Sequence, residues 1–381
     1  MSRIPNNIVG IDLGNHSLKA IRLQRKDGHY ALTGAAMVPA QLDMIHPMPP
    51  TELNTAVQIK ELASIIKFSG ADVHYTVNSL NGAVRYVESP RIPLQEIRSA
   101  LKLNSAAYLR QNFENYVFDV CPLDKEAAEA LAPPKRQAVS KGAPPPVAQA
   151  SKIKILVGGI STVEISLFFH ASNRAGVKPR SLQLAPISLI NGFEAAYPDI
   201  FRNQAVALLD FGFLSSSLTI LDKGTPLLTR IVPVGGKQIT EYIAHLSNLD
   251  FVKAETAKLQ GDPRLNDAVV QTTSTLIHEV RSSINFFEKN SDEPISTIYL
   301  AGGSMSSPVM VEVLSNEVGA PCKPWDPTQG LTVQLPLNQQ DLFSKNLPSF
   351  SAALGVARTY ATTPAPQKTT APAPPQPPAA A

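Results

Sequence analysis

The sequence predicts an α/β protein built as two lobes, and two observations carry this prediction. The chain has 381 residues, which is too long for a single compact core. A strand–turn–strand motif also occurs twice, at 8–21 (IVGIDLGNHSLKAI) and at 207–220 (ALLDFGFLSSSLTI). In each copy an apolar strand ends at an aspartate, a glycine follows two positions later, and a second apolar strand begins after the turn.

The two turns carry residue types that suit a nucleotide. Glycine lets backbone N–H groups approach a ligand, and concave clusters of such groups bind phosphate. The two aspartates, Asp12 and Asp210, can hold a magnesium ion through its water shell. Either motif alone is most often an ordinary turn. Because both copies lie in polar, hydroxyl-rich loops, together they predict two lobes that clamp one nucleotide between them.

The composition of the chain argues against several classes of protein. The net charge is only +3 and no basic stretch interleaves with aromatic residues, so nucleic-acid binding has no support. Cys121 and Cys322 are far apart and lack metal-ligand spacing, which suits a reducing cytoplasm. The first residues run straight into a strand and do not resemble a signal peptide. No apolar run approaches the roughly 20 residues needed to cross a bilayer. We therefore expect a soluble cytoplasmic protein.

Hydrophobic periodicity predicts the elements in order. In the first part of the chain we expect strands at 8–13, 17–24, 30–38, 71–77, 83–88 and 117–120, and helices at 54–68 and 95–112. In the second part we expect strands at 154–159, 227–234 and 297–301 besides the repeated motif, and helices ending near 176 and at 237–259, 267–289, 309–314 and 349–361. Proline-rich composition predicts a mobile insertion loop at 125–151 and a disordered tail at 362–381.

Two further glycine pairs follow predicted strands. Gly302-Gly303-Ser304 lies between a short buried strand and a helix. Paired glycines there allow a flat adenine or ribose to press against the main chain, and the helix N-terminus adds partial positive charge. Gly235-Gly236 stands at a second strand-to-helix junction, where it predicts close backbone contact with a ribose or phosphate. The plain alternative at both places is a loop that starts a helix.

In chain order the sequence thus offers Asp-x-Gly, Asp-x-Gly, Gly-Gly and Gly-Gly-Ser, and at this point it resembles the actin-like ATPase superfamily, which includes actin, the sugar kinases and FtsA. Within that superfamily it is similar to the PilM family of type IV pilus assembly proteins. The stretches that carry the resemblance are 9–14, 90–93, 233–236, 279–284, 300–304 and 350–358. The resemblance implies an actin-like ATPase (ribonuclease H-like) α/β fold, with two lobes around a nucleotide cleft and a small α+β subdomain inserted in the first lobe.

The resemblance also implies where the domains begin and end. The first lobe is expected at 1–71, completed by about 187–203 and 340–361. The inserted subdomain is expected at 72–186 and includes the proline-rich loop. The second lobe is expected at 204–339, before the tail.

The resemblance assigns a role to individual residues, with ATP and Mg²⁺ as the implied cofactors. Asp12 and Asp210 would face the magnesium ion and the phosphates from opposite lobes, as the catalytic and metal-binding pair. The residues implied to bind the nucleotide are Gly14, Asn15, His16, Ser17 and Lys19 in the first phosphate loop, Gly212, Ser215 and Ser216 in the second, Gly235 and Gly236 along the cleft, Glu255 and Lys258 at the ribose, Arg281 and Ser282 near the adenine, and Gly302, Gly303 and Ser304 around the adenosine.

Several of these residues also have plainer interpretations. Lys19 is equally well a solvated strand lysine. Glu255 and Lys258 have the i, i+3 spacing of an ordinary surface pair on a helix. His16, taken alone, is a loop residue whose ring points to water. The assignment of Arg281 depends on the register of its helix.

The second turn departs from the pattern of its relatives. It carries Phe213-Leu214 where they often have smaller or acidic residues, and Ser217 where many have aspartate or asparagine. No glutamine stands where a water-orienting group is expected. Because a loosely oriented water makes hydrolysis slow, we expect nucleotide binding with at most a slow ATPase activity.

In the PilM family the inserted subdomain helps to form a groove for the short cytoplasmic N-terminal tail of PilN, an inner-membrane protein. The resemblance therefore implies a chain that couples its nucleotide state to such a peptide and is recruited to the inner membrane through it and other pilus assembly components. Two alternatives stay open: an FtsA-like division or filament-forming protein, and a small-molecule kinase on the same fold. The first carries an amphipathic C-terminal helix, which the tail lacks, and the second needs a carboxylate base in the cleft.

Overall fold

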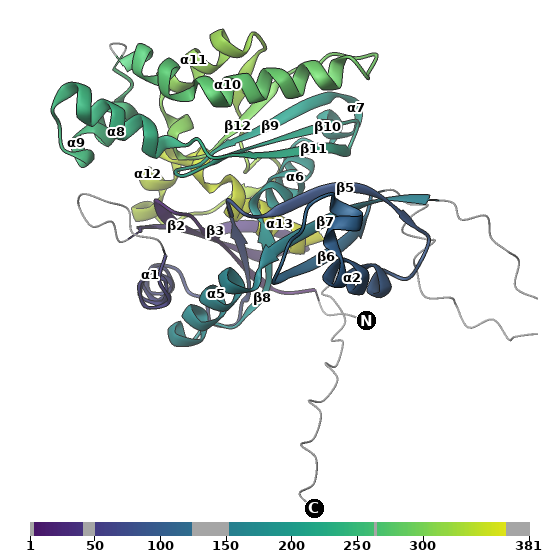
Figure 1. The fold of residues 1–381 in the computed structure, drawn as a ribbon. Helices are drawn as coiled ribbons and strands as arrows, with labels where there is room; N and C mark the ends of the chain where they lie inside the picture. The colour runs from purple at the N-terminus through teal and green to yellow at the C-terminus, as the bar shows by residue number, and fades with distance from the viewer. Residues whose placement is uncertain (1–3, 41–49, 124–151, 263–264, 363–381) are drawn as a thin grey trace, which may run out of the picture.

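The computed structural model describes residues 4–40, 50–123, 152–262 and 265–362. The insertion loop expected at 125–151 lies outside these residues, as does the tail expected at 362–381 except for its first residue. The described chain forms two large sheets and one sheet of three strands. Figure 1 shows the lobe of the second large sheet above that of the first, with the small sheet beside the first lobe.

The first sheet has the strand order β14-β3-β2-β1-β4-β8. The chain runs antiparallel through β1, β2 and β3, while β4 and β8 lie parallel to β1. Successive side chains of β1 face opposite sides: Val9 and Ile11 join the core under α1 and α5, whereas Ile8 joins the core under α12 and α13. The strands are β1 (Asn7–Leu13), β2 (Ser17–Lys26), β3 (His29–Pro39), β4 (Asp72–Val77), β8 (Pro179–Leu184) and β14 (Thr332–Val333), and the helices are α1 (Glu52–Ile65), α5 (Thr162–Ala175), α12 (Leu337–Lys345) and α13 (Ser351–Thr362).

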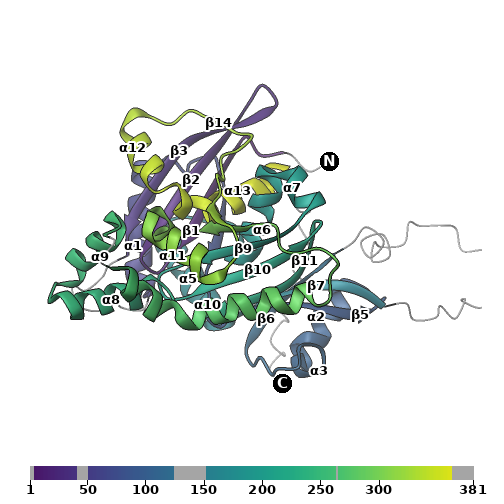
Figure 2. The ribbon, with the colours of Figure 1, turned by 90° about the horizontal axis from the view of Figure 1, so that it is seen from above.

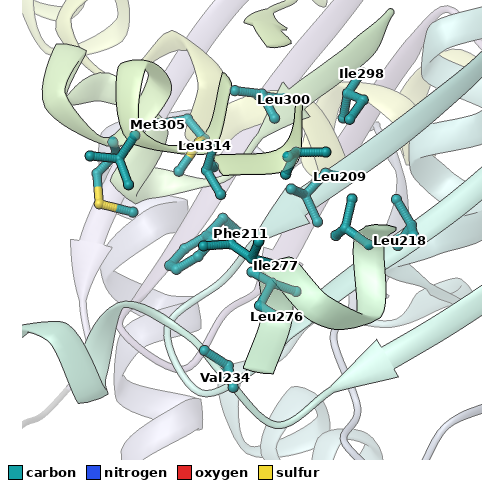
Figure 3. Close-up of a cluster of buried hydrophobic side chains, with 14 of the residues drawn as sticks. Leu209, Phe211, Leu218, Val234, Leu276, Ile277, Ile298, Leu300, Met305 and Leu314 are labelled. Atoms are coloured by element: carbon teal, nitrogen blue, oxygen red, sulfur yellow. The ribbon is translucent and has the colours of Figure 1, made fainter. Parts of the chain in front are cut away.

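The second sheet has the order β11-β10-β9-β12-β13 and repeats this two-sided construction. Leu209 and Phe211 of β9 enter the larger core, shown in Figure 3, whereas Leu208 faces the other side with α6 and α7. The strands are β9 (Ala205–Phe211), β10 (Ser216–Asp222), β11 (Thr225–Val232), β12 (Ile298–Ala301) and β13 (Cys322–Pro324). The helices are α6 (Ala185–Ala196), α7 (Pro198–Asn203), α8 (Gly236–Ser247), α9 (Phe251–Gln260), α10 (Asn266–Glu288) and α11 (Pro308–Val318).

The inserted sheet has the order β5-β7-β6 and carries its own small core. Its strands are β5 (Ala83–Pro90), β6 (Tyr116–Pro122) and β7 (Lys152–Ser161). Ile97 and Leu101, one turn apart on α2 (Leu94–Leu103), are buried against it. A second short helix, α3 (Ser105–Leu109), follows.

The observed topology changes the expected bounds of the insertion. β4 and β8 were assigned to the inserted subdomain, yet both pair within the first sheet. Parallel strands are covered on both faces of their sheet by packed side chains. Because β4 and β8 lie in this parallel part of the first sheet, they belong with the core of the first lobe. β14 likewise returns to the first sheet from within the expected second lobe. We therefore propose narrower bounds for the insertion, from about 83 to 161.

Two predicted helices are each divided in the structure. The helix expected at 95–112 stops at Asn104, whose side chain accepts a hydrogen bond from the Ala107 N–H and so begins α3. The helix expected at 237–259 stops at Asn248, which adopts a left-handed conformation, and Asp250 caps the next helix. At the first place one residue, Asn104, ends one helix and starts the next, whereas at the second place Asn248 ends a helix and Asp250 starts the next. Hydrophobic periodicity does not detect such caps.

Helices α6 and α13 cross between the two large sheets (Figures 1 and 2). The crossing is so close that a Cβ on Gly355 would stand 2.0 Å from the carbonyl oxygen of Ser188, and one on Gly192 would stand 2.9 Å from the Gly355 Cα. A Cβ on Gly10 of β1 would likewise lie 2.2 Å from the carbonyl oxygen of Ala353. These glycines let the backbones touch, and the helix pair therefore sets the spacing of the lobes.

Candidate functional site

The two repeated turns face each other across one cavity between the lobes. β1 ends beside Asp12, and β9 carries Asp210 near its end. The expected site residues that line this cavity are Asp12, Gly14, Asn15, His16, Ser17, Lys19, Asp210, Gly212, Glu255, Lys258, Gly302, Gly303 and Ser304. The fold thus brings most of the predicted nucleotide-binding residues together from both lobes.

Lys19 is a buried residue of the cleft rather than a solvated strand lysine. It lies opposite Asp12 in the antiparallel register of β1 and β2. Its Nζ donates to Asp12 Oδ2 at 3.1 Å and to the carbonyl oxygen of Ser17 at 3.1 Å. The two charged side chains are only 11% and 10% exposed, so their attraction is weakly screened.

The pKa of Asp210 is shifted by its surroundings in the cavity. Burial, followed by repulsion from the Asp12 carboxylate, raises the pKa of Asp210 to about 7, although the positive charge of Lys19 opposes the shift. β9 lies between β10 and β12, and Ala301 is the parallel partner of Asp210. The glycine turn after β12 is therefore carried to the same end of the sheet as this carboxyl group.

His16 reaches across the cleft instead of pointing to water. Its ring lies 4.9 Å from that of Phe213, in the turn of the opposite lobe. Burial is the main cause that lowers the pKa of His16, so its neutral form is favoured. Phe213, one of the residues at which the second turn was expected to depart from the family pattern, thus contacts the tip of the first turn.

Lys258 and Glu255 form a buried pair, not a surface pair. Lys258 Nζ lies 2.7 Å from Glu255 Oε2, 2.9 Å from Thr240 Oγ1 and 3.2 Å from the carbonyl oxygen of Gly236. The lysine side chain is 2% exposed, and its burial lowers its pKa. Helices α8 and α9 converge at this cluster, which forms one wall of the cavity.

The glycine pairs permit close packing around this wall. A Cβ on Gly236 would stand 2.7 Å from Ser304 Oγ and 3.0 Å from Lys258 Nζ. Gly302 has a positive φ of 102°, and its N–H donates to the carbonyl oxygen of Pro348 at 3.0 Å. A 3₁₀ turn (Gly303–Ser306) follows Gly302, and α11 begins at Pro308, next to the start expected at 309. The N-terminus of α11 thus lies about where the sequence predicted, separated from Gly302 by the 3₁₀ turn.

Six expected residues do not line the cavity. Ser216 turns away, and its hydroxyl donates to the carbonyl oxygen of Val234 at 2.7 Å. Ser215 is buried behind Gly212, whose N–H donates to the Ser215 carbonyl oxygen at 3.1 Å. Arg281 and Ser282 lie on α10 beyond the lining, and Arg281 is exposed. The last two of the six, Gly235 and Gly236, lie behind the wall formed by Lys258 and Ser304.

Sequence reasoning missed several residues that do line the cavity. Asn78 follows β4, which runs parallel to β1, and parallel strands bring their carboxyl ends to one edge. That argument would have found Asn78. Asn346 and Ser349 come from the segment before α13, and no local signal marks them. Their place depends on the contact between Pro348 and Gly302.

The donors present fit a magnesium ion that keeps most of its waters. Within the described ranges, no three histidine, cysteine, aspartate or glutamate side chains converge as a metal site. Asp12 and Asp210 supply two hard carboxylate groups from opposite walls of the cavity. Mg²⁺ usually takes one or two carboxylates together with water and substrate phosphates. The cavity measures about 130 Å³.

Comparisons with known proteins agree with this architecture. The family model described as "Type IV pilus assembly protein PilM" matches residues 163–360. The cell division protein FtsA of Bacillus subtilis (strain 168) is 23% identical over 269 residues, covering 66% of this chain and 57% of FtsA, so the match spans little more than half of that relative. The solved PilM–PilN type IV pilus biogenesis complex contains a chain of the same fold, with a TM-score of 0.75, 24% identity, and coverage of 93% of this chain and 99% of that one. The predicted actin-like ATPase fold is confirmed by this structural match.

The structure also bears on membrane association. Among the residues that it describes, no helix combines the length and the apolar composition needed to cross a membrane.

Proposed function

Because this chain belongs to the PilM family of type IV pilus assembly proteins, we propose that it binds Mg²⁺ and ATP between its lobes and that the bound nucleotide controls a peptide contact made with its inserted sheet. The single observation that carries the nucleotide proposal is the meeting of Asp12 and Asp210 in one buried cavity with the lysines Lys19 and Lys258. The two aspartates suit a magnesium cation, and the two lysine ammonium groups suit the negative charge of phosphate.

Each wall has a distinct task in this proposal. When bound, the magnesium ion neutralises phosphate charge, and Asp12 with Asp210 would hold it through its waters. Lys19 would donate its remaining hydrogen bond to a phosphate oxygen, because an ammonium group donates three and two of them go to Asp12 and Ser17. Lys258 and Glu255 would position the ribose, and Gly302 would let the adenosine approach the main chain. The cavity is smaller than the roughly 300–1,000 Å³ of typical ligand pockets, so the lobes are expected to part when the nucleotide enters.

One contact supports a link between the cleft and the inserted sheet. The insertion begins and ends in the first lobe. Its Tyr86 hydroxyl nevertheless lies 2.8 Å from Thr229 Oγ1 in the second lobe. Thr229 in turn lies 3.0 Å from Thr219 Oγ1 on β10, the strand that pairs with Asp210 at Ser217. A change in the distance between the lobes would therefore displace or break this contact.

The proposed partner is a short cytoplasmic peptide of a PilN-like inner-membrane protein. The most informative support is that the chain of the same fold described above was solved in a PilM–PilN complex. An extended peptide gains main-chain hydrogen bonds from a sheet edge and specificity from pockets for alternate side chains. The inserted sheet has two such edges, β5 and β6. This peptide would hold the protein at the cytoplasmic face of the inner membrane.

Calorimetry of the full chain tests the nucleotide proposal. We expect Mg²⁺-ATP to bind to the wild type and the Asp12→Ala variant to lose most of that affinity, because Lys19 would lose its carboxylate partner and the cation one ligand. Asp341→Ala, at a side chain that is 76% exposed on α12, is the matched control and should bind like the wild type. Unchanged binding by Asp12→Ala would refute the assigned site, and rapid phosphorylation of a sugar would favour a kinase.

A further inference from the structure

Asn78 lines the cavity beside the second turn motif, where its side chain approaches Gly212. It follows β4, and the parallel register places Thr76, two residues earlier, beside Asp12. Its side chain lines the cavity. Its Nδ2 lies 3.1 Å from the point where a Cβ on Gly212 would stand, so a first-lobe amide reaches the phosphate turn of the second lobe.

The side-chain oxygen of Asn78 is buried and has no hydrogen-bond partner among the described residues. Most buried polar atoms in native proteins are paired, and an unpaired one lowers stability. The charged neighbours in the same cavity, Lys19 and Lys258, both have partners. The Asn78 oxygen therefore has the capacity to accept a hydrogen bond from a group that enters the cavity.

The chemistry of a carboxamide suggests what completes this site. Its NH₂ group donates and its oxygen accepts, whichever way the amide is turned. A phosphate oxygen only accepts, whereas water also donates. Asn78 can thus donate to a phosphate oxygen while it accepts from a water molecule beside that phosphate.

The end of the neighbouring strand, β8, offers no other side chain that could bind a phosphate or a water molecule. β8 runs parallel to β4, with Leu184 beside Val77, and the next residue along each strand lines the cavity. After β8 that residue is Ala185, whose methyl group makes no hydrogen bond. Of these two adjacent strand ends, Asn78 alone presents a polar side chain.

We propose that Asn78 contacts the terminal phosphate of the bound nucleotide and holds a water molecule against it. This inference rests on the proposed nucleotide binding and extends it, because it names the residue that distinguishes a nucleoside triphosphate from a diphosphate. The side chain would bind ligand directly and would contribute nothing to the adenosine end of the site.

Calorimetry with Mg²⁺-ATP, Mg²⁺-ADP and adenosine tests the inference on the wild type, Asn78→Ala and Asn78→Leu. We expect both variants to bind ATP about tenfold more weakly, as for the loss of one hydrogen bond to a charged group, with ADP and adenosine affinities unchanged. Asn81→Ala, an exposed asparagine in the same loop, is the matched control and should bind all three ligands like the wild type.

Thermal unfolding without ligand separates this role from a structural one. Because the Asn78 oxygen has no partner, both variants should unfold at the wild-type temperature or above it. A lower unfolding temperature with equal loss of all ligands would overturn the inference in favour of a structural role. A wild type that binds ATP, with an unchanged ATP-to-ADP affinity ratio in both variants, would overturn this inference alone. A wild type that binds no ATP would overturn the proposed function as well.

Discussion

Single residues in the first lobe show how burial sets the protonation of a side chain. His74 on β4 is 3% exposed, its ring stacks on Tyr360 with centroids 3.7 Å apart, and its Nδ1 lies 2.8 Å from Ser181 Oγ. Burial lowers the pKa of His74 to about 4, despite the opposing charge of Asp72. A neutral imidazole is thus part of the folded core, joining the last helix to the first sheet.

The pKa of His74 predicts a loss of stability in mild acid. The unfolded chain takes up a proton near pH 6.5, whereas the folded chain does so only near pH 4. The free energy of unfolding should therefore fall by up to about 3 kcal/mol as the pH decreases across that window. Denaturant unfolding of the wild type and His74→Asn between pH 7 and pH 4 measures this: the advantage of the wild type should shrink as the pH falls. A constant difference between the two proteins would contradict the assignment.

Among the elements, the crossing of α6 and α13 is the most sensitive to a single atom. Gly355→Ala would place a methyl group 2.0 Å from the Ser188 carbonyl oxygen. This oxygen belongs to the backbone of a helix, so it cannot rotate aside as a side chain could. We expect a loss of about 3 kcal/mol in the free energy of unfolding, measured by denaturant titration. Gly158→Ala is the control, since its nearest neighbour would be an Ile187 methyl group at 3.4 Å. Equal stability of the two variants would show that the helices separate freely.

The elements also show where prediction from sequence stopped. Strands such as β1 and β9 were found because each has a long apolar run that ends in a polar turn. The division of the predicted helix at 237–259 was missed because it depends on Asn248 and Asp250, two ordinary surface residues. The membership of β4 in the first sheet was missed because strand pairing across a long connection leaves no local pattern.

On the scale of the whole molecule, the inserted sheet adds a contact with the second lobe to those made by the central helices and by the ring pair of His16 and Phe213. Tyr86 is the connecting side chain, and burial raises its pKa to about 12, so its hydroxyl stays protonated and able to donate to Thr229. β5 and β11, which carry these residues, are each the outermost strand of a sheet.

Removing this connection should weaken the coupling between nucleotide and peptide. For Tyr86→Phe we expect a stability loss of about 1 kcal/mol and unchanged ATP affinity, but a smaller effect of ATP on the affinity for a PilN-like peptide. Tyr116→Phe is the control, because its hydroxyl donates to the carbonyl oxygen of Asn81, which lies in the loop before β5 and not in the second lobe. Calorimetry with and without ATP gives both affinities. An undiminished ATP effect in Tyr86→Phe would show that the coupling follows another route.

The sequence by itself determined the local chemistry of this protein: two strand–turn–strand units, each with an aspartate and a glycine, and the glycine pairs after later strands. These features follow from side-chain periodicity and backbone freedom, which act over a few residues. Only the tertiary structure decided which of these groups meet. It buried Lys19 and Lys258 in one cavity, left Arg281 outside, and brought Asn78 to Gly212. The physical reason is that such contacts join distant parts of the chain, and their geometry exists only once the lobes have packed.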